Sequence, residues 1–128
     1  MEQSAVVPQN ASEARATVKK ALQARGRPEH TGVGASLQDA LMVATELVSN
    51  ALKYAGRLTD FTVSLRDNRI VISVSDTSDS TPPARPERPA GATPGTWGWW
   101  MVHHLAHAVS VVRVSGGGKT VTASLVLA

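Results

Sequence analysis

The stretch that most constrains the fold is residues 61–76, FTVSLRDNRIVISVSD, in which apolar and polar residues alternate. The apolar positions of its two halves are Phe61, Val63 and Leu65, then Ile70, Ile72 and Val74. Because successive residues of a strand point to opposite faces, this alternation predicts two strands with one buried face. Asp67 and Asn68 are turn residues between the two halves, so the stretch is predicted to be a β-hairpin.

Two helices are predicted before this hairpin. In residues 11–25 apolar residues recur at helical spacing with charges between them. A second helix is predicted over residues 36–55. Ser36 can cap its start, with Asp39 three positions on in a capping-box-like arrangement, and Gly56 can end it.

The second half of the chain starts with residues 77–96, which hold five of the seven prolines and are predicted to form a long irregular loop. A third helix is predicted over residues 97–108, followed by a second hairpin over residues 108–128. The run Gly116–Thr120 is similar to the tail of a phosphate-binding P-loop, but the residues after it alternate as a strand and not as a helix. We therefore interpret the glycine run as a hairpin turn.

The order helix, helix, hairpin, loop, helix, hairpin predicts an α+β fold. We expect a two-layer sandwich: a mostly antiparallel sheet with three helices on one face. At 128 residues the chain is predicted to be a single domain, residues 1–128, in which residues 1–10 are an edge strand or a flexible end.

Composition excludes several classes of protein. The absence of cysteine rules out disulfides, thiol catalysis and thiolate metal sites. The net charge of +3 is not clustered, which argues against nucleic acid as a partner. The N-terminus does not look like a signal peptide, and no apolar stretch approaches the roughly 20 residues that span a bilayer. We expect a cytoplasmic protein with no membrane contact.

The second predicted helix carries a carboxylate and a carboxamide one turn apart, Glu46 and Asn50, in the segment TELVSNALKYA, residues 45–55. At 100° per residue they project about 40° apart, away from the apolar arc around Leu41. A solvated surface gives the same pattern as a binding site. As a site, the amide oxygen of Asn50 suits Mg²⁺, and the carboxylate of Glu46 can accept a proton.

Two aromatic clusters on the third predicted helix leave alternatives open. His103 and His107 lie one turn apart and can share a metal, but no carboxylate joins them, so packing or surface roles compete with that interpretation. Trp97, Trp99 and Trp100 are all the tryptophans of the chain, and we expect one or two of them to be buried. An exposed one can anchor a partner.

TELVSNALKYA resembles the N-box of the GHKL (Bergerat-fold) ATPases, and further segments follow in that family's order. Asp76 ends a strand where the family has its adenine-reading aspartate, and residues 77–96 stand at its ATP lid. The resemblance implies ATP and Mg²⁺ as ligands, with Asn50 holding the metal and Lys53 assisting electrostatically. It further implies that the phosphates are bound by Gly95, Thr96, Trp97 and Gly98, and that Thr120 supports the base.

The first N-box position distinguishes branches of this superfamily. Sensor histidine kinases usually have Asn there, whereas this chain has Glu46, which is similar to the anti-sigma-factor serine/threonine kinases and to small ATP-binding regulators of actinobacteria. That likeness implies that Glu46 is the catalytic base and that the protein regulates transcription. The partners implied are a sigma factor, or an antagonist protein carrying the substrate serine, and relatives often form homodimers.

The glycine motifs depart from the family pattern. Asp76 is followed by Thr-Ser-Asp-Ser and not by the family's glycines, and Thr96 stands at the first glycine of the second motif. These departures favour an alternative in which the fold serves as a non-catalytic protein-binding regulator with weak or lost ATP binding.

Overall fold

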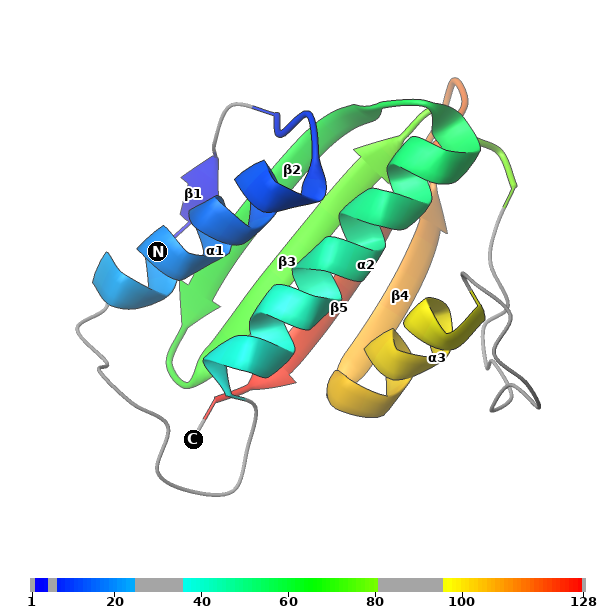
Figure 1. Ribbon diagram of the computed structural model, residues 1–128. Helices are drawn as coiled ribbons and strands as arrows, with labels where there is room; N and C mark the ends of the chain where they lie inside the picture. The colour runs from blue at the N-terminus through cyan, green and yellow to red at the C-terminus, as the bar shows by residue number, and fades with distance from the viewer. Residues whose placement is uncertain (1, 5–6, 25–35, 81–95, 128) are drawn as a thin grey trace.

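Five strands form one antiparallel sheet in the order β1-β2-β3-β5-β4, and three helices cover one of its faces (Figure 1). The computed structural model describes residues 2–4, 7–24, 36–80 and 96–127. The strands are β1 (Glu2–Ser4), β2 (Leu58–Arg66), β3 (Arg69–Asp76), β4 (Ala108–Arg113) and β5 (Lys119–Val126). The helices are α1 (Ala11–Ala24), α2 (Leu37–Ala55) and α3 (Thr96–Leu105). The predicted two-layer α+β sandwich is confirmed.

Both predicted hairpins are present, as β2–β3 and β4–β5. β2 begins at Leu58, three residues before the predicted start at Phe61, with a register shift between Leu58 and Asp60. The apolar alternation misses these residues because the bulge interrupts the two-residue period. β1 lies within the predicted edge strand of residues 1–10 and pairs with β2.

α2 begins and ends as predicted. The Ser36 side chain accepts a hydrogen bond from the Asp39 backbone N–H, and the Asp39 carboxylate accepts one from the Ser36 N–H, which completes a capping box. Gly56 ends the helix in the left-handed conformation, at φ 81°. The buried arc is rotated from the predicted one, since Ala40 and Val43 are fully buried while Leu41 is only partly buried.

α3 is shorter than predicted. It begins at Thr96, which was expected to end the loop, and stops at Leu105, three residues before the expected end. The reason lies in the sheet: the His107 N–H donates to the Ser124 carbonyl oxygen at 2.7 Å, so the chain has left the helix and joined β5 by that point. Strand pairing overrides the helical spacing here.

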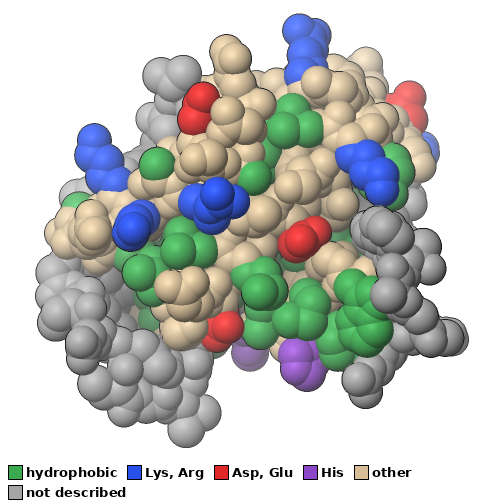
Figure 2. Space-filling model, viewed as in Figure 1, with side chains coloured by type: hydrophobic (Ala, Val, Ile, Leu, Met, Phe, Trp, Pro, Cys, Tyr) green, Lys and Arg blue, Asp and Glu red, His purple; other side chains and the backbone are tan. Residues whose placement is uncertain are grey.

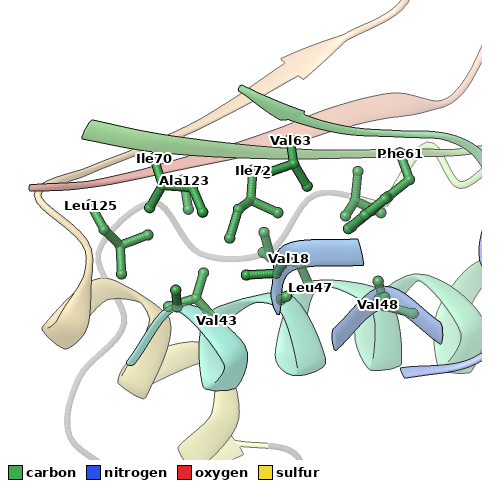
Figure 3. Close-up of a cluster of buried hydrophobic side chains, with 14 of the residues drawn as sticks. Val18, Val43, Leu47, Val48, Phe61, Val63, Ile70, Ile72, Ala123 and Leu125 are labelled. Carbon is green, nitrogen blue, oxygen red and sulfur yellow. The ribbon is translucent and has the colours of Figure 1, made fainter. Parts of the chain in front are cut away.

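The core lies between the sheet and α2 (Figure 3). α2 crosses the middle of the sheet, with α1 beside it over β2 and α3 on the β4 side (Figure 1). The largest fully buried side chains are Phe61, Ile70, Ile72, Leu125, Val18, Val43, Val48, Val63, Val74 and Val102. Each such side chain contributes roughly 1.5–3 kcal/mol when buried, which is how this layer holds α2 in place. None of the described helices combines the length and apolar character that crossing a membrane requires.

Candidate functional site

The N-terminal turn of α3 lies directly against the Glu46 side chain of α2. Gly98 is the third residue of α3, and a Cβ atom built on it would overlap the Glu46 carboxylate. Glycine at this position is therefore what allows the carboxylate to approach the helix backbone. The first N–H groups of a helix have no partner within it and favour anions, and Gly98 lies in that first turn of α3.

Glu46 is half-buried in this contact. Burial raises the pKa of its carboxyl above the ordinary value, because the charged form loses solvation. A carboxyl with a raised pKa is a better proton acceptor than one fully solvated. The position of Glu46 is thus compatible with the predicted general base, and that role stays a prediction.

Asn50 lies one turn further along α2 and is half-buried, with no hydrogen bond to its side chain among the described residues. Its amide oxygen is available to a hard cation such as Mg²⁺. Lys53 is exposed, and its Nζ lies 5.2 Å from the centroid of the Tyr54 ring, which is itself 63% exposed. The ammonium therefore lies at the surface beside Tyr54, and the described residues show no contact between it and Asn50 or Glu46.

Asp76, at the end of β3, forms a buried ion pair with Lys119, at the start of β5. The two residues are directly opposite each other in the antiparallel register, and Nζ lies 3.0 Å from Oδ1. Asp76 and Lys119 are only 5% and 6% exposed, and they are the two buried polar or charged residues among those that the structure describes. Oδ1 also accepts a hydrogen bond from the Ser78 N–H at 2.8 Å. No described group donates to Oδ2, so this oxygen remains available to a ligand.

The start of the predicted lid is held beside this ion pair by hydrogen bonds of Asp79. The Asp79 carboxylate accepts a hydrogen bond from the Gly118 N–H at 2.9 Å, and its carbonyl oxygen accepts one from the Arg113 guanidinium at 2.7 Å. Gly116, Gly117 and Gly118 all have positive φ and form the turn between β4 and β5, which confirms a hairpin turn in place of a P-loop. A Cβ on Gly118 would overlap the Asp76 carbonyl oxygen, so the turn packs closely on the end of β3.

Thr120 lies on the other face of the sheet from Asp76. Its hydroxyl is 2.8 Å from that of Ser75, and a second hydroxyl pair, Ser73 and Thr122, lies two residues along. Because side chains alternate between faces, Lys119 shares the helix-covered face with Asp76 and Thr120 does not. The structure therefore does not bring Thr120 to the predicted base site. Sequence reasoning missed Lys119, although counting back by twos from Val121 places it on the buried face.

The remaining predicted phosphate-binding residues surround the start of α3. Gly95 and most of the predicted lid lie outside the described residues, and Thr96 is the first residue of α3. Trp97 is half-buried, and its ring meets that of Trp100 edge-on, with 5.5 Å between centroids. Trp99 is the buried tryptophan, which confirms that at least one of the three enters the core.

The histidines of this region do not gather around a metal. His107 lies beyond the end of α3, so the helical spacing that would pair it with His103 is not realised. The His103 ring packs edge-on against Trp99 with 4.5 Å between centroids, and burial lowers its pKa. Within the described ranges no group of three His, Asp or Glu side chains is arranged to hold a metal ion.

The end of α2 and the Asp76–Lys119 pair lie at the same end of the sheet. α2 ends at Ala55 and β2 begins at Leu58, which pairs with Asp76, so the last turns of α2 reach the same end as the ion pair. The contact of Glu46 with Gly98 joins α3 to the middle of α2, nine residues before that helix ends. In the view of Figure 2, hydrophobic side chains gather on the α3 side, while Lys and Arg side chains are spaced apart across the described surface. The described residues thus present two polar groups: Glu46 and Asn50 on α2 beside α3, and the Asp76–Lys119 pair where β3 ends and β5 begins.

Comparison with known proteins gives the family. The model of the family described as "histidine kinase-like ATPase domain" matches residues 6–125. The chain belongs to this family of ATP-binding, kinase-like domains. Its structure is similar to that of the histidine kinase AdeS of Acinetobacter baumannii, with a TM-score of 0.54 and 12% identity over 99% of this chain and 68% of that one. At this identity the likeness concerns the fold. No curated protein matches the chain significantly.

The predicted membership of the GHKL superfamily is confirmed at the level of this family. The closer likeness to anti-sigma-factor kinases and the individual ligand contacts stay predictions.

Proposed function

We propose that this protein is an ATP- and Mg²⁺-dependent serine/threonine kinase of the anti-sigma-factor type, which regulates transcription by phosphorylating an antagonist protein. The observation that carries the proposal is the packing of Glu46 against Gly98, one turn from Asn50. It places a carboxylate of raised pKa beside the helix end that favours phosphate.

The residues of the site fit a magnesium nucleotide. Asn50 offers an unengaged amide oxygen to the cation, and Asp76 offers the buried Oδ2 to the amino group of adenine. Mg²⁺ bound with ATP neutralises phosphate charge, which is the main electrostatic requirement of phosphoryl transfer. Gly98 and the N–H groups near it would hold the phosphates, and Glu46 would accept the proton that the attacking serine hydroxyl loses.

The partner belongs to the proposal as well. A sigma factor, or an antagonist that carries the serine, would bind where its hydroxyl group can reach Glu46. The protein would act in the cytoplasm and without nucleic acid, and a homodimer is compatible with relatives of this type.

A second function is favoured by the ion pair at Asp76. Lys119 and the Ser78 N–H already occupy Oδ1 of the carboxylate that would read adenine, which leaves only Oδ2 for a base, and the glycines of the usual motifs are replaced after Asp76 and at Thr96. These features support a non-catalytic regulator that uses the same fold to bind a protein, with weak or lost ATP binding.

Calorimetry with ATP and Mg²⁺ separates the two functions. The kinase should bind MgATP, and Asn50→Ala should abolish this binding because it removes the metal ligand. Glu46→Ala should leave binding intact and stop transfer of labelled phosphate to a co-purified partner. Gln38→Ala is the matched control, since it removes an exposed side-chain amide from the far end of α2.

The outcomes are distinct. A wild-type protein with no affinity for MgATP refutes the kinase and supports the non-catalytic regulator. Binding of MgATP without transfer to any co-purified partner would leave ATP as a ligand and argue against Glu46 as a base.

A further inference from the structure

We infer that Lys119 is a second base-reading residue, whose ammonium donates a hydrogen bond to the ring nitrogen beside the amino group of a 6-aminopurine. Asp76 would accept from the amino group itself through Oδ2. The inference rests on the nucleotide-binding function proposed above and adds a specificity-determining residue to that site.

The first support is the unused hydrogen-bonding capacity of the pair. A lysine ammonium carries three donors, and the structure uses one of them, in the contact with Oδ1 of Asp76 at 3.0 Å. Oδ1 accepts from both Lys119 and Ser78, which occupies its two lone pairs, whereas Oδ2 accepts from no described group. A donor and an acceptor therefore stand side by side without partners in the described chain.

The second support is burial. Lys119 and Asp76 are 6% and 5% exposed. Buried polar groups are normally satisfied, and an ion pair withdrawn from water is stabilised only when further hydrogen bonds complete it. In this pair the Lys119 ammonium still has donors, and Oδ2 of Asp76 still has acceptor capacity, that no described residue uses. A ligand with a matching edge can complete these hydrogen bonds.

The third support is the position of the pair. Lys119 and Asp76 project from the helix-covered face at the sheet end where α2 ends. Ser78 and Asp79 fix the adjoining backbone, through Oδ1 of Asp76 and the Gly118 N–H, so the geometry of the pair is set before any ligand enters. Pre-ordered groups lose little freedom on binding.

The edge that fits this arrangement has one donor next to one acceptor. The amino group and N1 of adenine provide such an edge, and a carboxylate alone would leave N1 without a partner. Lys119 supplies the missing donor. A base with two adjacent donors could bind Oδ2 with only one of them, and its second donor would face the Lys119 ammonium, which cannot accept a hydrogen bond. The pair therefore selects for the 6-aminopurine edge.

The test uses the wild-type full chain and a change in the ligand. Calorimetry with Mg²⁺ compares ATP with 1-deaza-ATP, in which N1 is replaced by a C–H group. Loss of one hydrogen bond from a charged donor should weaken binding by about 10- to 100-fold. The control ligand is 7-deaza-ATP, which loses a ring nitrogen on the other edge and should bind as ATP does.

A protein variant completes the cycle. Lys119→Met should bind ATP and 1-deaza-ATP equally, because the donor that tells them apart is gone. Circular dichroism checks its fold, and the wild-type comparison decides the matter even if this variant does not fold. Equal wild-type affinity for ATP and 1-deaza-ATP overturns the role of Lys119 and leaves the proposed function standing. No wild-type affinity for ATP overturns both.

Discussion

Removing Lys119 should destabilise the protein strongly, whether or not a nucleotide binds. At 3.0 Å the attraction between its ammonium and the Asp76 carboxylate is about 5–6 kcal/mol for an effective dielectric constant of about 20. Desolvation of both charges offsets much of that, so the intact pair contributes little net stability. Lys119→Met, however, leaves the Asp76 charge buried and unpaired, and such a change typically costs about 3–5 kcal/mol.

That loss is a large part of the total. A chain of this length is expected to be stable by roughly 6–19 kcal/mol, at about 0.05–0.15 kcal/mol per residue. Asp76→Asn should also be costly, because it leaves the ammonium without a counter-charge, while its amide oxygen can still accept from the Ser78 N–H. The double variant Asp76→Asn/Lys119→Met contains neither charge and should lose less than the sum of the two single losses.

Urea denaturation followed by tryptophan fluorescence measures the free energy of unfolding of the wild type, the two single variants and the double variant. The double-mutant cycle should give a coupling free energy of about 2 kcal/mol or more between the two positions. Raising the salt concentration from about 0.1 M to about 1 M should change this coupling little, since a buried pair is poorly screened. Single losses below about 1 kcal/mol, or losses that simply add, would show that the ion pair is not buried as described.

Three further predictions concern the glycines and Glu46. Gly98→Ala places a methyl group where the Glu46 carboxylate lies, so this flexible carboxylate should move into solvent. The free energy of unfolding should then change by no more than about 1 kcal/mol. The pKa of Glu46 should fall toward its ordinary value, because the carboxyl is no longer buried. An unchanged pKa in a carbon-detected NMR titration would contradict this packing. Glu46→Gln should stabilise the protein at neutral pH, because the raised pKa means that folding disfavours the charged form. The extra stability of Glu46→Gln over the wild type should vanish as the pH falls below the ordinary glutamate range, where the wild-type carboxyl is protonated in both the folded and the unfolded state. A difference in unfolding free energy that stays constant across a pH series of denaturations would refute the burial effect. Gly118→Ala and Gly116→Ala both place a side chain at positive φ, at about 1–2 kcal/mol each. Only Gly118→Ala also overlaps the Asp76 carbonyl oxygen, and this overlap should add about 1–3 kcal/mol to its loss of unfolding free energy in urea melts. Equal losses for the two variants would argue against that contact.

The elements with strong local signals could be predicted from the sequence. The alternation over residues 61–76 predicted the β2–β3 hairpin, and the capping box of Ser36 and Asp39 predicted the start of α2. These signals work because hydrogen bonds within a helix or across a tight turn join residues close in sequence. The bounds that were wrong, at Leu58 and Leu105, depend on pairing with strands far along the chain.

The candidate site divides in the same way. That Glu46 and Asn50 share one side of α2 follows from helical spacing alone. The contact of Glu46 with Gly98 joins positions 52 residues apart, and no local pattern encodes it. Thr120 lies on the face away from Asp76 for a related reason: a shift of one residue along a strand moves a side chain to the other face of the sheet.

The pairing of Lys119 with Asp76 shows how such a site can be read more closely from sequence. Val121, Ala123 and Leu125 mark the buried face of β5, and two residues back from Val121 on that face is Lys119. A lysine on a buried face needs a counter-charge, because burial without one is prohibitive. Asp76 continues the buried face of β3 in the same way, two residues beyond Val74. The two residues meet once β3 and β5 pair, so strand periodicity combined with charge complementarity selects both the partner and the register.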